Sequence, residues 1–496
     1  MKHSSLLPDD SHPHAPPPPL RLLHWIFFWA MVLALSWVIL GSIVAMLALC
    51  AGLGVVLLCR RVEIPRFSLV LFVLAFLLRL GTVLMVQPPP ESDFATLLEA
   101  SQLFRDGDYS FQSWGYFQNW AGQTGQVIFQ GLLLRLWDNV LLIKLVNCLA
   151  ASGVTVLVYL IARRFFQESA AQAASLFYCV SALPLAMVSV LTNQHTATFL
   201  TFLGIYLLTG IPEDPPQSSG SPFRCLPVRF AAAGLLTALA NFLRPDALMV
   251  LVAVGAYCLF AGLQRPFRSH FSRCGLCLLC FLGAYFLLFG LLSWGVAALG
   301  INSQGLSTGN FWLKFVYGFS QESRGQYSKA ANQAISQLTA QGMDRTAAQK
   351  ALFWKELQTA GPRDLLQLFE DKLAVLWKGS ALFWPLGYLH EAHPHLYDYA
   401  VKYESFCSIS TLILGLFGFV CSRRPSRTSL QSLLPAFLLF SAFSVYLLIE
   451  VQARYIYGIQ PALYILAAGG IDAQRILFQF PLNDSSARHS LNSSKH

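Results

Sequence analysis

Two carboxylates, one residue apart, lie near the start of a polar and aromatic stretch, residues 87–126, which directly follows an apolar run. They belong to Glu91 and Asp93. A carboxylate just outside a membrane can act as a general base that takes the proton of an attacking hydroxyl. Acidic residues are also common after membrane spans, where they need do no chemistry. Both residues are therefore candidate catalytic groups, and either can be the base.

Aromatic side chains fill the same stretch. They can stack on the faces of sugar rings, or they can form the belt that aromatic residues make at a membrane–water interface. The set consists of Tyr109, Phe111, Trp114, Tyr116, Phe117 and Trp120. From this set we take Tyr116 as a candidate substrate-binding residue.

A second charged group lies in a short turn near the C-terminal end, where Glu450, Arg454 and Tyr455 separate two apolar runs. A fixed arginine at a membrane surface can stabilise the negative charge that grows on a leaving phosphate, and it can bind phosphate through two parallel hydrogen bonds. Arg454 can equally snorkel at a helix start or pair with Glu450 one helical turn away. All three residues are candidate substrate ligands.

Three further positions carry polar groups close to apolar runs. His195 ends a short turn that we expect on the outer side, and it is a candidate substrate ligand, although a lone histidine is more often a solvated turn residue. Lys378 is a candidate phosphate partner. Residues 244–246, Arg-Pro-Asp, interrupt an apolar segment. Ionisable groups inside a membrane are suspected of function, but adjacent opposite charges favour a structural pair here.

Two groups of residues in the sequence have the residue types of a metal site. Cys274, Cys277 and Cys280 are spaced like part of a metal site, and histidines cluster at residues 390–395. A structural zinc site needs four ligands, and neither group supplies a convincing set. We therefore expect no metal and no cofactor.

The composition predicts a membrane protein. Of the 496 residues 55% are hydrophobic and only 12% are charged, against about 25% charged in soluble domains. Apolar runs of about 20 residues recur, which is the length that spans a bilayer. The net charge of +9 comes from short basic clusters between these runs, as the positive-inside rule describes. A nucleic-acid partner is therefore excluded.

The alternation of apolar runs and basic clusters predicts the organisation of the chain. We expect cytoplasmic tails at both ends, a long polar insert on the outer side, and roughly twelve spans. The expected segments are a cytoplasmic tail 1–22, an N-terminal transmembrane module 23–298 with an outer catalytic loop 87–137, an extracytoplasmic insert 299–403, C-terminal transmembrane helices 404–470 and a cytoplasmic tail 471–496.

The order of these features resembles that of the GT-C glycosyltransferases, and the nearest branch is the protein O-mannosyltransferase-like and lipid A aminoarabinose transferase-like enzymes. The features are an outer loop with Asp93 and Phe94, Gly107 after an amphipathic helix, Gly125 before a second one, Asn147 in the next span, the break at residues 241–245, the large insert, and Glu450, Arg454 and Tyr455 before the closing helix.

The resemblance implies an all-α polytopic membrane protein with a GT-C-like fold and a mainly helical extracytoplasmic insert. It implies inverting transfer of a sugar from a polyprenyl-phosphate donor to a hydroxyl of a glycan, lipid or protein, at the outer face of the cell membrane. Asp93 would be the base and Arg454 a ligand of the donor phosphate, with no essential metal. The family often has two adjacent acids, whereas Ser92 separates them here, so the base can also be Glu91.

Two other functions stay open. A multi-span transporter or flippase of lipid-linked sugar would place broken or charged helices at the middle of the membrane, usually in two related halves. Only residues 244–246 fit that pattern, and no internal repeat is convincing. A scaffold without catalysis on the same fold is the third possibility.

Overall fold

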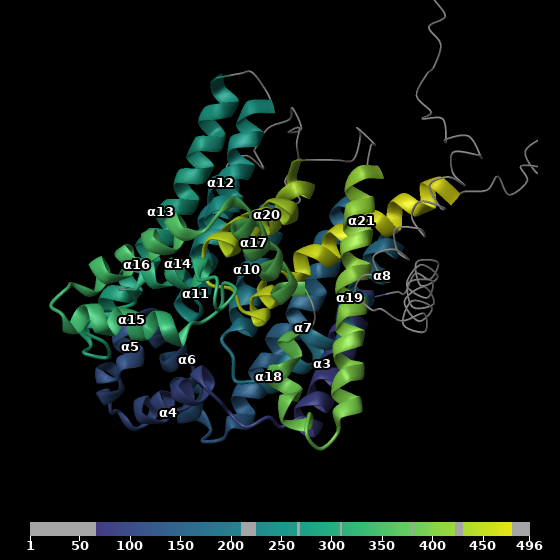
Figure 1. Ribbon diagram of the computed structural model, residues 1–496. Helices are drawn as coiled ribbons and strands as arrows, with labels where there is room; N and C mark the ends of the chain where they lie inside the picture. Colours follow the sequence, from purple (N-terminus) through teal and green to yellow (C-terminus); the bar gives the residue numbers. More distant parts are fainter. Residues whose placement is uncertain are drawn as a thin grey trace, which may run out of the picture.

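The computed structural model describes residues 66–209, 225–264, 268–307, 310–377, 380–421 and 430–478, in which every regular element is a helix (Figure 1). The predicted tail 1–22, the apolar run 23–59 and Lys378 lie outside these residues. The described part of the chain therefore has the all-α architecture that the sequence predicts.

Five helices are long and apolar enough to cross a membrane, and the bent pair of α8 and α9, with 57° between its parts, makes up to six. This indicates a multi-pass membrane protein. The count of roughly twelve spans stays a prediction, since residues 23–59 are not described. The five spans lie in α3 (Phe67–Met85), α7 (Val140–Phe165), α11 (Cys225–Leu243), α13 (Arg268–Ala298) and α19 (Pro394–Cys421).

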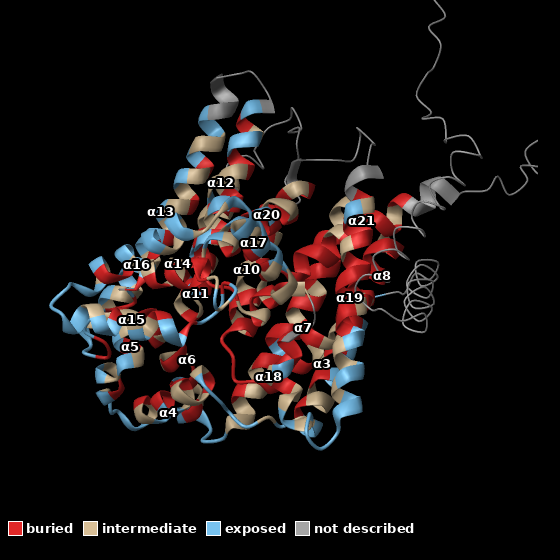
Figure 2. Cartoon of the chain, viewed as in Figure 1, coloured by how far each residue is buried: buried red, intermediate tan, exposed pale blue. Residues whose placement is uncertain are grey.

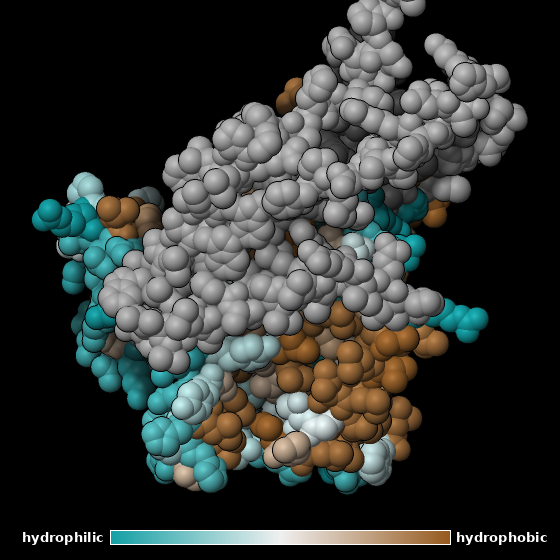
Figure 3. Space-filling view, turned by 90° about the vertical axis from the view of Figure 1, so that its right-hand side faces the viewer, coloured by the Kyte–Doolittle hydropathy of each residue, from teal (hydrophilic) through white to brown (hydrophobic). Residues whose placement is uncertain are grey.

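The first of these helices, α3, is apolar over most of its surface, yet one side of it is buried and the other is exposed. In α3 the buried residues recur every four positions, at Phe67, Leu71, Ala75 and Arg79, which places them on one side of a helix. Leu77 is 58% exposed on the other side. Figure 3 shows a broad apolar surface on the side of the molecule where α3 and α19 lie. We assign that surface to lipid.

The largest cluster of buried apolar residues includes residues of α7 and α19, and buried residues concentrate there (Figure 2). Shorter helices complete it. They are α8 (Glu168–Val180), α9 (Ala182–Ala186), α10 (Gln194–Leu208), α12 (Ala247–Gln264), α20 (Leu434–Leu448) and α21 (Gln460–Phe478).

The outer loop folds into two main helices, α4 (Asp93–Asp106) and α6 (Thr124–Leu136), with the short helix α5 (Gly115–Asn119) between them. The sequence places amphipathic pieces at 93–106 and 124–137, so the helix bounds agree closely. The two main helices pack against each other, and their small core is completed by Val296, Ile301 and Leu306 from the end of α13 and the chain after it.

The polar insert is helical and rests on the outer loop. Asn310 donates to the side chain of Asn119 at 2.7 Å, which joins the two regions. Ser328 and Asp344 accept hydrogen bonds from backbone N–H groups in the first turns of α15 and α16, as N-cap residues do. The helices are α14 (Phe311–Phe319), α15 (Lys329–Ala340), α16 (Arg345–Thr359), α17 (Pro362–Trp377) and α18 (Phe383–Leu386).

Candidate functional site

The two candidate groups of the sequence, Asp93 and Arg454, meet in the structure. Asp93 is the first residue of α4, and its Oδ2 accepts a hydrogen bond from Nη2 of Arg454 at 2.8 Å, across 361 residues of chain. The Asp93 side chain is 37% exposed and that of Arg454 only 8%. Ser92, just before, has φ of 52°, a region rare for a residue with a side chain. The carboxylate is thus reachable, while the arginine is held.

Several groups fix the plane of the Arg454 guanidinium. Its Nε donates to Oε1 of Gln452 at 2.7 Å. Its Cζ lies 4.8 Å from the ring centre of Phe94 and 5.0 Å from that of Trp384, which is within cation–π range. Gln194 donates to the Arg454 carbonyl at 2.6 Å. The arginine is therefore preorganised to present its remaining donors in one direction.

A second ion pair joins the insert to the same turn. Nζ of Lys314, on α14, lies 2.5 Å from the buried carboxylate of Glu450 and 3.4 Å from the Tyr455 hydroxyl. It also lies 4.8 Å from the ring centre of Trp120. Gln452 donates to Glu450 at 2.7 Å, so one amide links the two ion pairs. Burial lowers the pKa of Lys314, but Tyr455 and Glu450 outweigh it and raise the pKa overall. Lys314 therefore stays a cation at neutral pH.

A third ion pair comes from the break between α11 and α12. Arg244 and Asp246 pair with each other across Pro245, as the structural interpretation of this motif predicts. However, Arg244 also donates to Oδ1 of Asn193 at 3.1 Å, and its Cζ lies 5.3 Å from the ring centre of Tyr455. The break is thus part of the site.

The three ion pairs surround one tyrosine. Tyr455 is 9% exposed, and its carbonyl accepts a hydrogen bond from the Tyr446 hydroxyl at 3.3 Å. Three cations and three carboxylates balance each other, so the paired side chains carry no net formal charge. We call the following residues the Tyr455 cluster: Tyr455, Asp93, Arg454, Glu450, Lys314, Arg244 and Asp246.

The remaining predicted residues of the outer loop lie close to this cluster. Tyr116, on α5, is half-buried, and burial followed by the nearby charge of Asp93 raises the pKa of its phenol. Glu91 is exposed, and its carboxylate makes no hydrogen bond or ion pair with any residue that the structure describes. The Glu91 carboxylate is therefore open to solvent, and it stands two residues before Asp93 in the chain.

The structure corrects the expected place of His195. The residue is not a solvated turn residue. It lies in the first turn of α10 with no exposed surface. Its Nε2 donates to the Met187 carbonyl at 3.0 Å, and its Nδ1 accepts from the Tyr457 hydroxyl at 2.6 Å. Both ring nitrogens are occupied within the core, so the structure does not bring this residue into the cluster.

Among the residues that the structure describes, no group of three histidine, cysteine, aspartate or glutamate side chains is arranged to hold a metal ion. Three members of the site itself escaped sequence reasoning, namely Lys314, Gln452 and Trp384. Gln452 lies between Glu450 and Arg454 and could have been included on that ground. Nothing local marks Lys314, because only packing brings α14 to the C-terminal turn.

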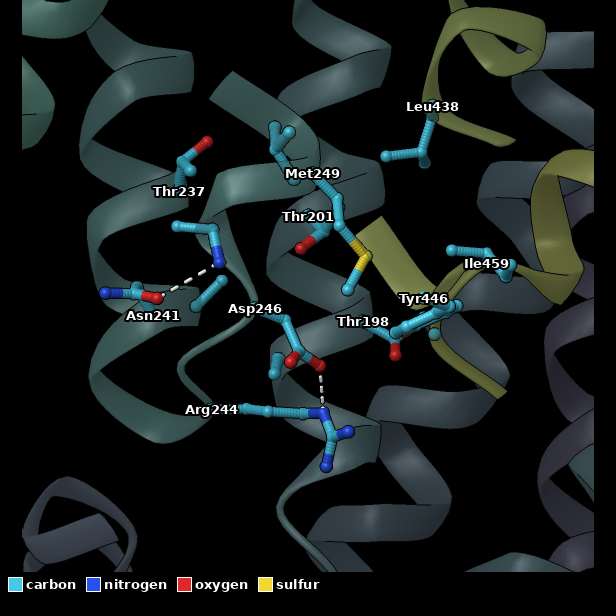
Figure 4. A pocket seen from close by; sticks show the side chains of 15 residues that line it. Thr198, Thr201, Thr237, Asn241, Arg244, Asp246, Met249, Leu438, Tyr446 and Ile459 are labelled. Carbon is cyan, nitrogen blue, oxygen red and sulfur yellow. Dashed lines mark hydrogen bonds and ion pairs between the residues drawn. The ribbon is translucent and has the colours of Figure 1, made fainter. Parts of the chain in front are cut away.

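A pocket with about 480 Å³ of empty space, its open mouth included, adjoins the cluster between α10, α11, α12 and α20. Figure 4 shows Arg244 and Asp246 at one end of it, Asn241 and Thr237 on one side, and Leu438 and Ile459 on the opposite side. Thr198 and Thr201 of α10 also line it. The pocket thus combines polar and apolar walls.

No profile of a known protein family matches this sequence, and no curated protein matches it. Among solved structures, the archaeal oligosaccharyltransferase AglB from Archaeoglobus fulgidus, in complex with an inhibitory peptide and a dolichol-phosphate, is similar with a TM-score of 0.44 and 13% identity. The match covers 82% of this chain and 50% of that one. The chain spans about half the length of that protein.

Proposed function

We propose that this chain is an integral-membrane glycosyltransferase that moves a sugar from a polyprenyl-phosphate donor to a hydroxyl acceptor on the outer face. The observation that carries the proposal is the 2.8 Å contact between Asp93 and Arg454. It places a reachable carboxylate next to a fixed, largely buried cation at the end of membrane helices. Inverting transfer to a hydroxyl from a lipid phosphate needs that pair of groups.

Asp93 acts as the base in this proposal. The acceptor oxygen attacks the anomeric carbon, its proton passes to the Asp93 carboxylate, and the bond from that carbon to the phosphate oxygen breaks. The lipid phosphate leaves with the bonding electrons, and Arg454 stabilises the new charge. Glu91, exposed two residues earlier, is the group that can replace Asp93 as base.

The ion pair of the resting site fits this role. The Asp93 oxygen that accepts from the guanidinium at 2.8 Å is occupied by that contact in the resting site. A donor phosphate that takes over the Arg454 donors releases Asp93 from that cation. Lys314 and Arg244 add positive charge around the same tyrosine. Donor binding therefore frees the Asp93 carboxylate to accept the proton of the acceptor hydroxyl.

The test compares transfer of radiolabelled sugar from polyprenyl-phosphate donors to membrane acceptors by the parent, Asp93→Asn and Glu91→Gln. Removing the base lowers transfer by about 10²–10⁴-fold, while donor binding stays. Glu99→Gln, an exposed carboxylate on the same helix, is the matched control and keeps full activity. Full transfer by Asp93→Asn would move the base to Glu91, and the class of the labelled product identifies the acceptor as glycan, lipid or protein.

One observation favours a second function, a transporter or flippase of lipid-linked sugar. The partly polar pocket lies at the broken helix of residues 244–246, and transporters often use discontinuous helices for binding. Movement of a labelled donor across proteoliposome membranes decides between the two functions. A transporter would move the donor in the Asp93→Asn variant and would make no transfer product.

A further inference from the structure

One buried amine of the insert bridges another helix of the insert and a helix of the apolar core. Lys372, on α17, is 1% exposed. Its Nζ donates to the carbonyl of Gly318, at the end of α14, at 2.8 Å and to that of Leu447, at the end of α20, at 2.7 Å. These acceptors are 54 and 75 residues away in the chain. A single side chain thus joins α17, α14 and α20.

The segment that follows Leu447 is held by the insert at two more points. The N–H of Glu450 donates to the Lys314 carbonyl at 2.8 Å, and the N–H of Val451 donates to the Gly325 carbonyl, also at 2.8 Å. Residues 447–451 are therefore held by three separate parts of the insert. The Lys372 amine binds Leu447, the first residue of this segment. The next residues along the chain, Gln452 and Arg454, belong to the site.

Two glycines show how closely the parts approach. A Cβ on Gly318 would lie 2.6 Å from the Ile449 carbonyl carbon, and one on Gly325 would lie 2.6 Å from Cε of Lys372. Gly325 also has a φ of 75°, which residues with a side chain rarely adopt. The Lys372 stem therefore fills a space that only glycines leave open.

We propose that Lys372 is a positioning residue that holds residues 447–451 against the insert and thereby sets where Glu450 and Arg454 stand in the Tyr455 cluster. Its effect on transfer rests on the proposed function. The effect of Lys372 on the structure of residues 447–451 does not depend on the proposed function, and it is measured separately.

Two carbonyls accept from the Lys372 amine, and its Nζ also lies 5.8 Å from the ring centre of Phe319. A neutral amine has two N–H groups, and two carbonyls accept them, whereas an ammonium carries a third N–H and a charge that burial penalises. Burial lowers the pKa of Lys372 from 10.5 to about 7. Two ion pairs lie on the elements around it, Asp371 with Arg324 and Lys314 with Glu450, and α17 also carries Arg363, Asp364 and Glu370. Burial is the cause of the lowered pKa of Lys372.

The direction of the pH effect follows from this shift. When the segment detaches, the amine regains its ordinary pKa of 10.5 and takes up a proton. Between pH 7 and 10 the detached state therefore binds more protons than the attached state, so attachment strengthens as pH rises, by up to about tenfold for each pH unit. Below pH 7 both states are protonated and the effect levels off.

The experiment is hydrogen exchange of the backbone amides of Glu450 and Val451 in the full chain in lipid nanodiscs, at pH 6 to 9 and corrected for intrinsic rates. The variants are Lys372→Met, which keeps the stem and removes the donors, and Lys372→Gln, which keeps two neutral N–H donors. Lys355→Met, an exposed lysine on α16, is the control.

We expect Lys372→Met to speed exchange of these two amides about tenfold or more at pH 8 and to abolish the rise of protection with pH. Lys372→Gln recovers part of the protection with a flat pH profile, and Lys355→Met behaves as the parent. A flat profile in the parent, or parent-like protection in Lys372→Met, would overturn the proposal. If Lys372→Met does not fold, the parent profile and Lys372→Gln still decide.

Failure of the proposed function gives a different result. If the parent shows the pH-dependent protection but transfers no sugar, the positioning role stands and the transferase does not. If the parent transfers sugar and its protection is independent of pH and of Lys372, the transferase stands and the positioning role falls.

Discussion

Two lysines of the insert contact the same short segment of chain, and their surroundings shift their pKa values in opposite directions. Lys314 faces the Glu450 carboxylate, and its pKa is raised despite burial. Lys372 faces two backbone carbonyls, and burial lowers its pKa to about 7. The partner decides the outcome: a carboxylate keeps a buried amine charged, while carbonyl groups leave it to act as a neutral donor.

The opposite pKa shifts indicate different roles for the α14 side and the α17 side of the insert. On the α14 side, charge is retained in a site that an anion can reach, since the Lys314 side chain is 29% exposed. On the α17 side, charge is removed and only the hydrogen bonds remain, which suits a joint between two parts of the fold. The comparison can be tested by changing each partner in turn.

The largest effect on stability is expected from Lys314→Met. The change leaves the Glu450 carboxylate, 3% exposed, without its cation, and breaking a buried pair in this way costs about 3–5 kcal/mol. Thermal unfolding in detergent measures the loss. The double variant Lys314→Met with Glu450→Leu removes the stranded charge and should recover much of it. No recovery would mean that packing, rather than the charge pair, is responsible.

Lys372→Met should cost less, about 1–3 kcal/mol, because it leaves two carbonyls without donors but strands no charge. The same unfolding measurement applies, with Lys355→Met as the surface control. A loss as large as that of Lys314→Met would contradict the view that Lys372 works as a neutral group.

The pH profile of the unfolding temperature separates the two lysines. For Lys372 the folded pKa of about 7 is below the ordinary value of 10.5, so its contribution to stability rises from pH 7 toward pH 10. For Lys314 the folded pKa is above the ordinary value, so its contribution is complete below that value and is lost as pH rises beyond it. The Lys372→Met variant should lack the rise in unfolding temperature from pH 7 toward pH 10. The Lys314→Met variant should lack the fall in unfolding temperature at higher pH. A parent unfolding temperature that stays constant from pH 7 to 10 would refute the prediction for Lys372.

The smallest effect is expected from Trp120→Leu, which removes the ring 4.8 Å from Lys314 Nζ. A cation–π contact at a partly exposed site contributes about 0.5–1 kcal/mol. Unfolding of this variant alone and with Lys314→Met gives the coupling between the two side chains. A coupling as large as that with Glu450 would mean that the ring, and not the carboxylate, keeps Lys314 charged.

Local pattern was sufficient for the class of fold and for naming four members of the Tyr455 cluster: Asp93, Glu450, Arg454 and Tyr455. Lipid selects long apolar helices, so composition and run length alone predicted a helical membrane protein, and the helix at 93–106 followed from amphipathic spacing. Asp93 and Arg454 were found because few charged residues stand in turns beside apolar runs. In each case the physical cause acts over one or two helical turns, which sequence displays directly.

Only the tertiary structure decided which groups meet. The contact of Asp93 with Arg454 spans 361 residues, and no local property of either residue requires it. Packing alone also brought Lys314 to Glu450, placed Arg244 beside Tyr455 and withdrew His195 into the core. The Lys372 amine had no special mark in the sequence, because its lowered pKa arises from burial by helices that are distant in the chain. Charge and hydrogen-bond partners depend on distances of a few ångströms, and these are determined by how the helices pack.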